Sequence, residues 1–491
     1  MPSITSFAPT RSIACVAVLA CAAFAPSSSL SAQAKPGATT PPKLGAPKGL
    51  TVPAIVERVL PNGLRLVFVE QHELPIIDVS LIVRSGAEAD PKGKAGLATL
   101  TANMLDEGAG ALDALGIAEQ IGYLAIRLNT GAAFEQSAVN LHTTRTTLDS
   151  ALALMADVVL RPTFPEKEFT RLKNDRLTAL LQEADRGPVI ADRAFNAIVF
   201  GEDHPYGRST SGTREDAESL GRADVVGFWK TWYRPNNTTV VVVGDLSLAE
   251  AVQKITATFG GWERAALPTI ASATPNRASA TTIYVVDKPK APQTSFRIGG
   301  VGVARSTKDY YPLMVMNTAL GGSFTSRLNN NLRETKGYTY GAGSSFSMRR
   351  EPGAFTARAE IVAEKTDSAM LEFMKELRSI RKPMPAAELA KAKRYLQLGY
   401  AEGFESTADI ASQIASLIPA GVPLASLGRF NAGIGAVTAA QVQRAAQTYL
   451  DPAKLTIVVA GDRATIEPAL KALKIAPVEV RDAKGRGIIT P

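Results

Sequence analysis

The chain has 491 residues, of which 45% are hydrophobic and 20% are charged. This length predicts two to four domains with large cores, and the composition is that of an ordinary globular protein. The net charge of +8 contains no block of five or six like charges. This argues against a nucleic-acid-binding module and favours a mixed, solvated surface over a basic face for an acidic partner or a membrane.

The N-terminus predicts export. Arg11 precedes an apolar run over residues 13–24, and small residues then lead to Ala32-Gln-Ala34, an A-x-A cleavage site. The run is too short to span a bilayer, which needs about 20 residues. We therefore expect a signal peptide over residues 1–34 and a periplasmic mature chain without cysteine or disulfides. The alternative is a membrane-anchored lipoprotein, because Val18-Leu-Ala-Cys21 is compatible with a lipid-attachment box.

The first half of the mature chain alternates between strand and helix patterns. Residues 35–53 are rich in Pro and Gly and predict a flexible leader. The Asn62-Gly63 turn joins two strand-like runs into a hairpin. Periodicity predicts strands over 56–60, 64–69, 76–83, 125–129, 138–143 and 238–245, and helices over 96–106, 116–123, 148–160, 166–184 and 222–233.

One unit of the sequence occurs twice. The segment 233–246, which contains Gly244-Asp245, matches the segment 449–462, which contains Gly461-Asp462. Such self-similarity predicts a duplicated domain. We expect an α+β fold of two homologous halves, 54–262 and 282–472, joined by a linker over 263–281 and followed by a tail over 473–491. Each half is expected to be an antiparallel-rich mixed sheet with helices packed on one face.

The segment 85–105 resembles the zinc-binding helix of the pitrilysin/insulinase family of metallopeptidases, which carries an inverted H-x-x-E-H motif. The histidine positions fall on Thr99 and Asn103 and the glutamate position on Ala102. Threonine and alanine cannot replace an imidazole and a carboxylate, and an amide is a weak zinc ligand. The chain has three histidines, and no two are four residues apart. The sequence therefore predicts that this chain binds no catalytic zinc.

Two other segments of the sequence could contain metal ligands. The family's third ligand, a glutamate, falls near Leu180, and Glu183 is the nearest carboxylate, out of register by nearly one turn and expected to be solvated. His204 could be a metal ligand with Glu202 or Asp203, but a structural turn is the preferred interpretation, because adjacent carboxylates on a loop form a poor metal site.

The segment 320–340 closely resembles the family segment G-G-x-x-x-S-R-L-x-x-x-L-R-E-x-x-G-x-x-Y. In the family, its arginine and tyrosine hydrogen-bond the substrate near the zinc. The resemblance places these roles on Arg333 and Tyr340, whose donors suit a peptide carbonyl or an oxyanion. Gly321 and Gly322 are expected either to lie close to the substrate or to serve packing. Asn129 and Gly131 lie in the segment that corresponds to the family's substrate-pairing edge strand.

In this family, a lost zinc site together with a retained Arg–Tyr pair is typical of one kind of subunit. The resemblance implies halves that close like a clam around a peptide, and some members divide the work between two chains, one with zinc and one without. The leading hypothesis is the zinc-free subunit of a periplasmic heteromeric metallopeptidase, with zinc expected in a homologous partner subunit. The alternative is a non-catalytic peptide-binding or scaffold protein. Hydrolysis by a nucleophile of this chain is disfavoured, because the sequence has no suitable Cys or G-x-S-x-G elbow.

Overall fold

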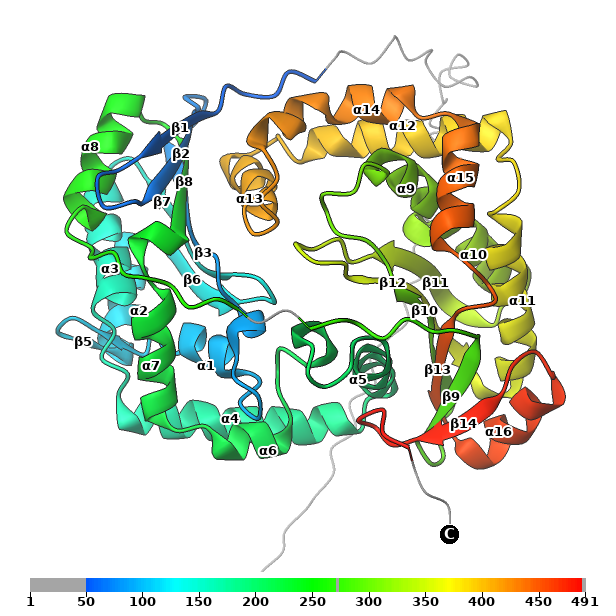
Figure 1. The fold of residues 1–491 in the computed structure, drawn as a ribbon. Coiled ribbons are helices and arrows are strands. Elements are labelled where there is room, and N and C mark those ends of the chain that lie inside the picture. Colours follow the sequence, from blue (N-terminus) through cyan, green and yellow to red (C-terminus); the bar gives the residue numbers. More distant parts are fainter. Residues whose placement is uncertain (1–49, 271–272, 488–491) are drawn as a thin grey trace, which may run out of the picture. The chain divides into compact units, whose positions relative to one another are not determined.

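The computed structural model describes residues 50–270 and 273–487, which contain two six-stranded sheets (Figure 1). The predicted signal peptide, the possible lipid site at Cys21 and most of the leader lie outside these residues. Every helix in the described part of the chain is too short or too polar to span a membrane.

The first half begins with the predicted hairpin. Strands β1 and β2 pair antiparallel, and Gly63 between them adopts a positive φ of 88°, which favours glycine. The elements are β1 Val56–Val59, β2 Arg65–Glu70, β3 Ile76–Val83, α1 Leu97–Asn103, β4 Gly108–Ala109, β5 Leu112–Asp113, α2 Ala114–Leu124, β6 Arg127–Ala132, β7 Ser137–Thr144, α3 Leu148–Leu160, α4 Glu166–Ala184, α5 Gly187–Phe200, α6 Arg214–Ser219, α7 Arg222–Trp232, β8 Thr238–Gly244 and α8 Leu248–Phe259.

The second half contains two π-helical segments besides its helices and strands. Its elements are β9 Thr282–Asp287, β10 Gln293–Val301, α9 Tyr310–Asn317, a π-helix Thr318–Gly322, α10 Arg327–Asn329, a π-helix Asn330–Thr335, β11 Thr339–Phe346, β12 Ala354–Val362, α11 Thr366–Ser379, α12 Ala386–Glu402, α13 Thr407–Leu417, α14 Phe430–Ala436, α15 Ala439–Tyr449, β13 Thr456–Gly461, α16 Arg463–Ala472 and β14 Val478–Arg481.

The two sheets have equivalent strand orders. The first runs β1-β2-β8-β3-β7-β6 and the second, in the same sense, β14-β9-β13-β10-β12-β11. The repeated Gly-Asp units end β8 and β13, which occupy the same place in the two sheets and pair in parallel with β2 and β9. The predicted duplication and the antiparallel-rich mixed sheets are confirmed. Strands β6 and β11 occupy equivalent edges of the two sheets, and the outer edge of β11 is covered in part by Asn329 and Asn317.

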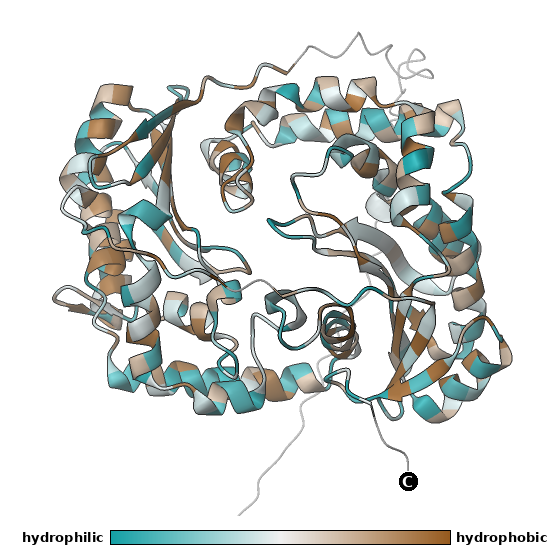
Figure 2. Cartoon of the chain, viewed as in Figure 1, coloured by the Kyte–Doolittle hydropathy of each residue, from teal (hydrophilic) through white to brown (hydrophobic). Residues whose placement is uncertain are grey.

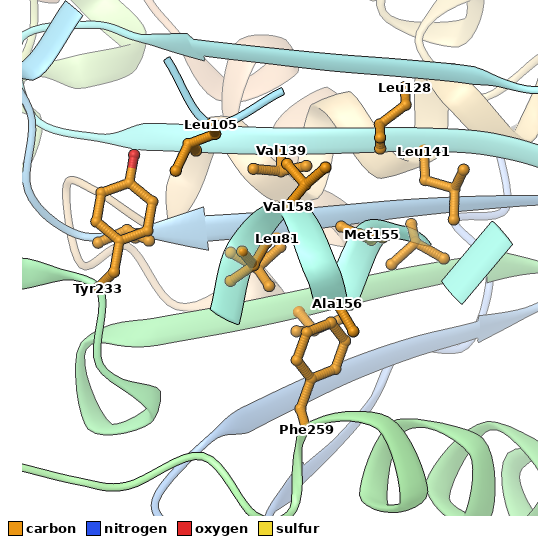
Figure 3. Close-up of a cluster of buried hydrophobic side chains, with 14 of the residues drawn as sticks. Leu81, Leu105, Leu128, Val139, Leu141, Met155, Ala156, Val158, Tyr233 and Phe259 are labelled. Atoms are coloured by element: carbon orange, nitrogen blue, oxygen red, sulfur yellow. The ribbon is translucent and has the colours of Figure 1, made fainter. Parts of the chain in front are cut away.

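The core of the first half lies between its sheet and its own helices. Met155 and Val158 of α3 lie with Leu81 of β3 and with Val139 and Leu141 of β7 in one buried cluster (Figure 3). These strand residues are spaced by two and the helix residues by three, as expected where one face of a strand meets one face of a helix.

The second face of each sheet is covered by a helix of the other half. Helix α5 packs against β10 and β13, and α13 packs against β3 and β8. Both helices are largely hydrophobic in Figure 2, as expected for helices buried against a sheet. The prediction of helices on one face was therefore incomplete, because the sequence pattern of a helix does not say which half it covers.

Two other elements differ from the expectations. Helix α5 was not predicted, although Arg186-Gly187-Pro188 is a reasonable helix start with Pro in its first turn. The segment predicted as a tail after residue 472 contributes β14, which pairs in parallel with β9 and extends the second sheet. Its four residues are too few to show a clear alternating pattern.

A polar cluster also joins the halves. The loop between β11 and β12 brings Arg350 to Glu88, with 2.9 Å between Nη2 and Oε1, and its backbone N–H donates to Glu135 at 2.9 Å. Glu135 also accepts a hydrogen bond from the Tyr206 hydroxyl. Arg349 lies 3.8 Å from the ring centroid of Phe134. Both glutamates are buried, so this cluster fixes the loop against the first half.

Candidate functional site

Gly96 and Asp90 hold the start of helix α1. Gly96, with a φ of 93°, precedes it, and a Cβ there would lie 2.9 Å from the carbonyl oxygen of Ser211. The buried carboxylate of Asp90 accepts hydrogen bonds from the backbone N–H groups of Gly96 and Ala98, each at 2.8 Å. A carboxylate at these orphan N–H groups stabilises the helix start.

The side chains at the zinc-ligand positions are used for packing or face solvent. The Thr99 hydroxyl donates to the carbonyl oxygen of Thr210 at 2.9 Å, Ala102 is fully buried, and Asn103 is exposed. On α4, Leu180 is buried at the position of the third ligand. These residues do not fit a zinc ion, because together they supply one hydroxyl and one amide in place of imidazoles and a carboxylate.

Glu183 does not take the place of the missing ligand. Its carboxylate lies 2.5 Å from Nη2 of Arg193 on α5, with both side chains about three-quarters buried. The expectation that Glu183 is simply solvated was wrong, because α5, which the sequence patterns did not reveal, supplies its partner. Among the residues that the structure describes, no group of three or more His, Cys, Asp or Glu side chains could hold a metal ion.

The three histidines lie in separate structural contexts. His204 is buried, and its Nδ1 accepts the Tyr206 backbone N–H at 3.0 Å, which confirms its role in a structural turn. Burial lowers its pKa. His72 is exposed between Glu70 and Asp245, and His142 lies 2.9 Å from Asp78. None of them contacts α1 in a way that would rebuild a metal site.

Arg333 and Tyr340 lie on either side of one tight turn that enters the edge strand β11. Gly337, with a φ of 66°, makes the turn and donates its N–H to the carbonyl oxygen of Arg333 at 3.0 Å. Tyr340 is 91% exposed, on a β-bulge between Thr339 and Ala342. Bulges re-aim side chains and are frequent near active sites. The Tyr340 hydroxyl is thus available to a ligand.

Phe324 forms a platform beside this pair, which the sequence analysis missed. Its ring is 63% exposed, and the Arg333 guanidinium carbon lies 4.5 Å from the ring centroid. This cation–π contact restrains the guanidinium without using its hydrogen-bond donors. The only charged group within ion-pairing distance of Arg333 in the described residues is Glu334, at 3.5 Å. The signal available in the sequence was an aromatic residue eight positions before Leu332-Arg333-Glu334.

The scaffold under Arg333 is rigidly held. Asn331 donates to Glu372 and Glu376 of α11 at 2.8 and 2.7 Å, and Arg327 makes a bidentate pair with Glu388 of α12 at 2.7 and 2.6 Å. The Glu388 carboxylate raises the pKa of Arg327. The two arginines of the motif therefore differ: Arg327 is bound to α12, whereas Arg333, whose side chain is 36% exposed, packs on the ring of Phe324.

This difference predicts opposite stability effects. We expect Arg327→Ala to lower the free energy of unfolding by about 1.5–3 kcal/mol, because it leaves Glu388 without its charged partner. Arg333→Ala is expected to change it by no more than about 0.5 kcal/mol. Urea denaturation of both variants measures this, and equal losses would contradict the assignment.

Of the other predicted site residues, Gly321 and Gly322 lie in a π-helix of the second half, and Asn129 and Gly131 lie on an edge strand of the first half. A Cβ on Gly321 would lie 2.3 Å from the backbone nitrogen of Ser344, and one on Gly322 would lie 2.7 Å from Nδ2 of Asn317. Gly321 therefore allows the π-helix to approach β11 closely, and Gly322 packs against Asn317 of α9, which favours the packing interpretation for both. Asn129 and Gly131 lie on β6, which is indeed an edge strand. Their role in substrate binding stays a prediction.

A cavity of about 660 Å³ lies beside the start of α1 and helix α5. It is lined by the loop 207–213, by α5, by Ala95 next to α1 and by residues 483–486. Its wall carries both cations and carboxylates, of which Glu183 is paired with Arg193 and Asp192 with Arg297. No motif pointed to this cavity, because its lining comes from five separate parts of the sequence, including Phe134.

Comparison with protein families identifies the fold. A model described as insulinase (peptidase family M16) matches residues 65–214, and one described as peptidase M16 inactive domain matches residues 219–396. The chain belongs to the insulinase family of peptidases, M16. The expected family is therefore confirmed, over both halves.

Relatives in the M16 family include proteins described as peptidases and one described as inactive. An uncharacterized zinc protease of Mycobacterium leprae is 28% identical over 359 residues, 72% of this chain and 80% of the relative. The non-peptidase homolog YmxG of Helicobacter pylori is 24% identical over 360 residues, 72% of this chain and 82% of the relative. The fold alone thus does not decide activity.

Solved structures agree with the fold. A peptidase M16 inactive domain from Pseudomonas fluorescens superposes with a TM-score of 0.78 at 27% identity, covering 83% of this chain and 98% of that chain. The periplasmic protease PqqL of Escherichia coli gives 0.69 at 15% identity, covering 86% of this chain but 50% of that chain. This chain is therefore a peptidase-fold protein that lacks the zinc-ligand residues of active members.

Proposed function

We propose that this chain is the zinc-free subunit of a periplasmic heteromeric metallopeptidase. It contributes Arg333 and Tyr340 to peptide hydrolysis at the zinc of a homologous partner subunit. The observation that carries the proposal is the contrast between two surfaces. Helix α1 has no zinc-ligand side chains, whereas Tyr340 of β11 is exposed and Arg333, before the same strand, is partly exposed.

The chemistry of the pair fits this role. The guanidinium offers several N–H donors in a plane and the phenol offers one O–H, and both are suited to a peptide carbonyl whose oxygen gains negative charge during hydrolysis. The Phe324 ring holds the guanidinium by its face and leaves these donors available. We infer that the pair binds the peptide and stabilises the transition state, while the partner supplies the nucleophilic water.

A two-unit arrangement is supported by the length of a neighbour. The match to PqqL covers half of that chain, so a fold of this size occurs there as part of a longer protein. In this protein the second unit would be a separate chain. PqqL is described as periplasmic, which agrees with the export signal expected in residues 1–34; fractionation of cells producing the tagged full-length chain tests this location.

The first experiment is an affinity pull-down of the tagged mature chain from its own cells. We expect a chain with H-x-x-E-H in roughly equimolar amount, and zinc and peptidase activity in the isolated complex. Recovery of the chain alone, without zinc and inert toward peptides, would contradict the subunit role. That result would favour a peptide-binding protein, for which the edge strand β6 offers backbone hydrogen bonds to an extended peptide.

The decisive variant is Arg333→Ala within the complex. We expect kcat/KM for a quenched fluorescent peptide to fall by about 10²–10³, the usual loss when one oxyanion donor is removed. Tyr340→Phe, which removes one hydroxyl, is expected to act in the same direction. Arg214→Ala on α6 is the control, because that arginine is exposed and pairs with Glu218 in the first half. Unchanged activity of Arg333→Ala in an intact complex would refute the role.

A further inference from the structure

The buried side chain of Asn329 connects the two parts of the chain that carry the proposed site. It lies at the end of α10 and is only 4% exposed. Its Oδ1 accepts the backbone N–H of Ala342 at 3.1 Å, and its Nδ2 donates to the carbonyl oxygen of Phe324 at 2.7 Å. These partners fix the orientation of the amide, because a backbone N–H needs an acceptor and a carbonyl needs a donor.

One of these two anchors holds the bulge of Tyr340. The bulge lies between Thr339 and Ala342, where β11 has one residue more than β12. The Thr339 hydroxyl accepts the N–H of Gly341 at 3.1 Å and donates to its carbonyl oxygen at 2.9 Å, which closes the bulge locally. Asn329 then ties the residue at the end of the bulge, Ala342, to α10. The bulge is therefore held by Asn329 as well as by the hydrogen bonds between β11 and β12.

The other anchor holds the platform of Arg333. The carbonyl that Asn329 binds belongs to Phe324, whose ring lies under the guanidinium. The side chains of Phe324 and Thr325 are both open to solvent. Asn330 and Lys391 donate to the neighbouring carbonyl oxygen of Thr325, whereas Asn329 binds that of Phe324 itself. An amide that binds both the loop and the bulge therefore sets the distance between the aromatic platform and the base of Tyr340.

We propose that Asn329 is a positioning residue, which sets the relative placement of Arg333 and Tyr340 through its hydrogen bonds to Phe324 and Ala342. This inference rests on the proposed function. A side chain that fixes two ligand-binding groups need not touch the substrate itself, yet a misplacement of 1 Å can cost about 10²-fold in rate. Asparagine suits the task because one short side chain carries both a donor and an acceptor.

The test uses the complete complex and three variants. We expect Asn329→Ala to lower kcat at least about tenfold and to change KM less than about twofold, because the peptide still binds while its carbonyl is misaligned. Asn329→Asp keeps an acceptor for Ala342 and loses the donor to Phe324, so its kcat should be intermediate. Asn237→Ala is the matched control: Asn237 is also buried and donates to Ser85 and Trp232, far along the chain from β11.

Hydrogen exchange of the chain alone separates this inference from the proposed function. We expect faster exchange at Ala342 in Asn329→Ala, with unchanged exchange in β12 and unchanged exchange at Ala342 in Asn237→Ala. Unaltered exchange at Ala342, normal kcat in Asn329→Ala, or an equal loss of kcat in Asn237→Ala would each overturn the positioning role. If the wild-type complex hydrolyses no peptide, the proposed function fails, and the exchange at Ala342 still decides whether Asn329 holds the bulge.

Discussion

Phe195→Ala is expected to lower the free energy of unfolding by about 3–5 kcal/mol, the usual cost of deleting a buried aromatic ring. Phe195 is 2% exposed on α5, in a buried cluster with Val458 and Ala460 of β13. Ile414→Ala, on α13, should cost about 2–5 kcal/mol for the same reason, since Ile414 is fully buried against Val241 and Val243. The two helices that cross between the halves are therefore predicted to be major stabilising contacts.

Urea denaturation measures both effects, with Leu181→Ala as the control. Leu181 lies on α4 and is 58% exposed, so its truncation should change the stability by no more than about 0.5 kcal/mol. If Phe195→Ala and Leu181→Ala proved equally mild, α5 would not be packed against the second sheet in solution.

The second large expected effect is a fall in stability as the pH rises from about 4.5 to about 7. Burial raises the pKa of Glu88 from 4.5 to about 7, against the opposing effect of Arg350, and burial raises that of Asp90 from 3.8 to about 7. In this window the folded chain keeps protons that the unfolded chain has released. Stability is therefore greatest below the unfolded pKa and is lost as the pH approaches the folded one.

The size of the effect follows from the shift. A difference of one pKa unit corresponds to about 1.4 kcal/mol, so Glu88 alone contributes on the order of 3 kcal/mol across the window. Glu88→Gln should flatten this part of the pH profile, because the amide oxygen still accepts from Arg350 but does not titrate. Thermal unfolding from pH 4.5 to 7.5 measures the difference between the two proteins. Parallel profiles would show that folding does not raise the pKa of Glu88.

Other carboxyl groups act outside this window. Hydrogen bonds from Ser247 lower the pKa of Glu250 to about 2, and that of Glu372 is also about 2, where the hydrogen bond from Asn331 is the largest lowering effect. These groups stabilise the fold above the unfolded pKa of about 4.5, and this stabilisation is lost as the pH falls toward 2. The comparison of wild type with Glu88→Gln is therefore most informative above pH 4.5.

Much of the architecture followed from local pattern. The strands 64–69 and 76–83 and the helices 148–160 and 166–184 were predicted within about a residue, because their periodicity is strong. The repeated Gly-Asp units revealed the duplication, and the sheets confirm it. The patterns predicted neither α5 nor α13, and only the tertiary fold shows that each of these helices covers the sheet of the other half.

The candidate site likewise has features that could be predicted from the sequence and features that could not. The substitutions at Thr99, Ala102 and Asn103 could be identified by position alone, since zinc chemistry depends on residue type. The bulge that exposes Tyr340, the ring of Phe324 under Arg333 and the amide of Asn329 depend on where the loop returns to β11. Such contacts between positions five to thirteen residues apart have no sequence period, so no pattern could predict them.

The packing of α5 and α13 against the sheet of the other half has a consequence for how the protein is made. The apolar strand face formed by Val67, Val69 and Val241 is complete once β8 has been synthesised, yet the helix that covers it begins only at Thr407. A nascent first half therefore presents an uncovered hydrophobic surface while most of the second half is still being translated. Long-range closure of this kind is slow and prone to aggregation. A chaperone that keeps the nascent first half unfolded until α13 has been synthesised would avoid that exposure.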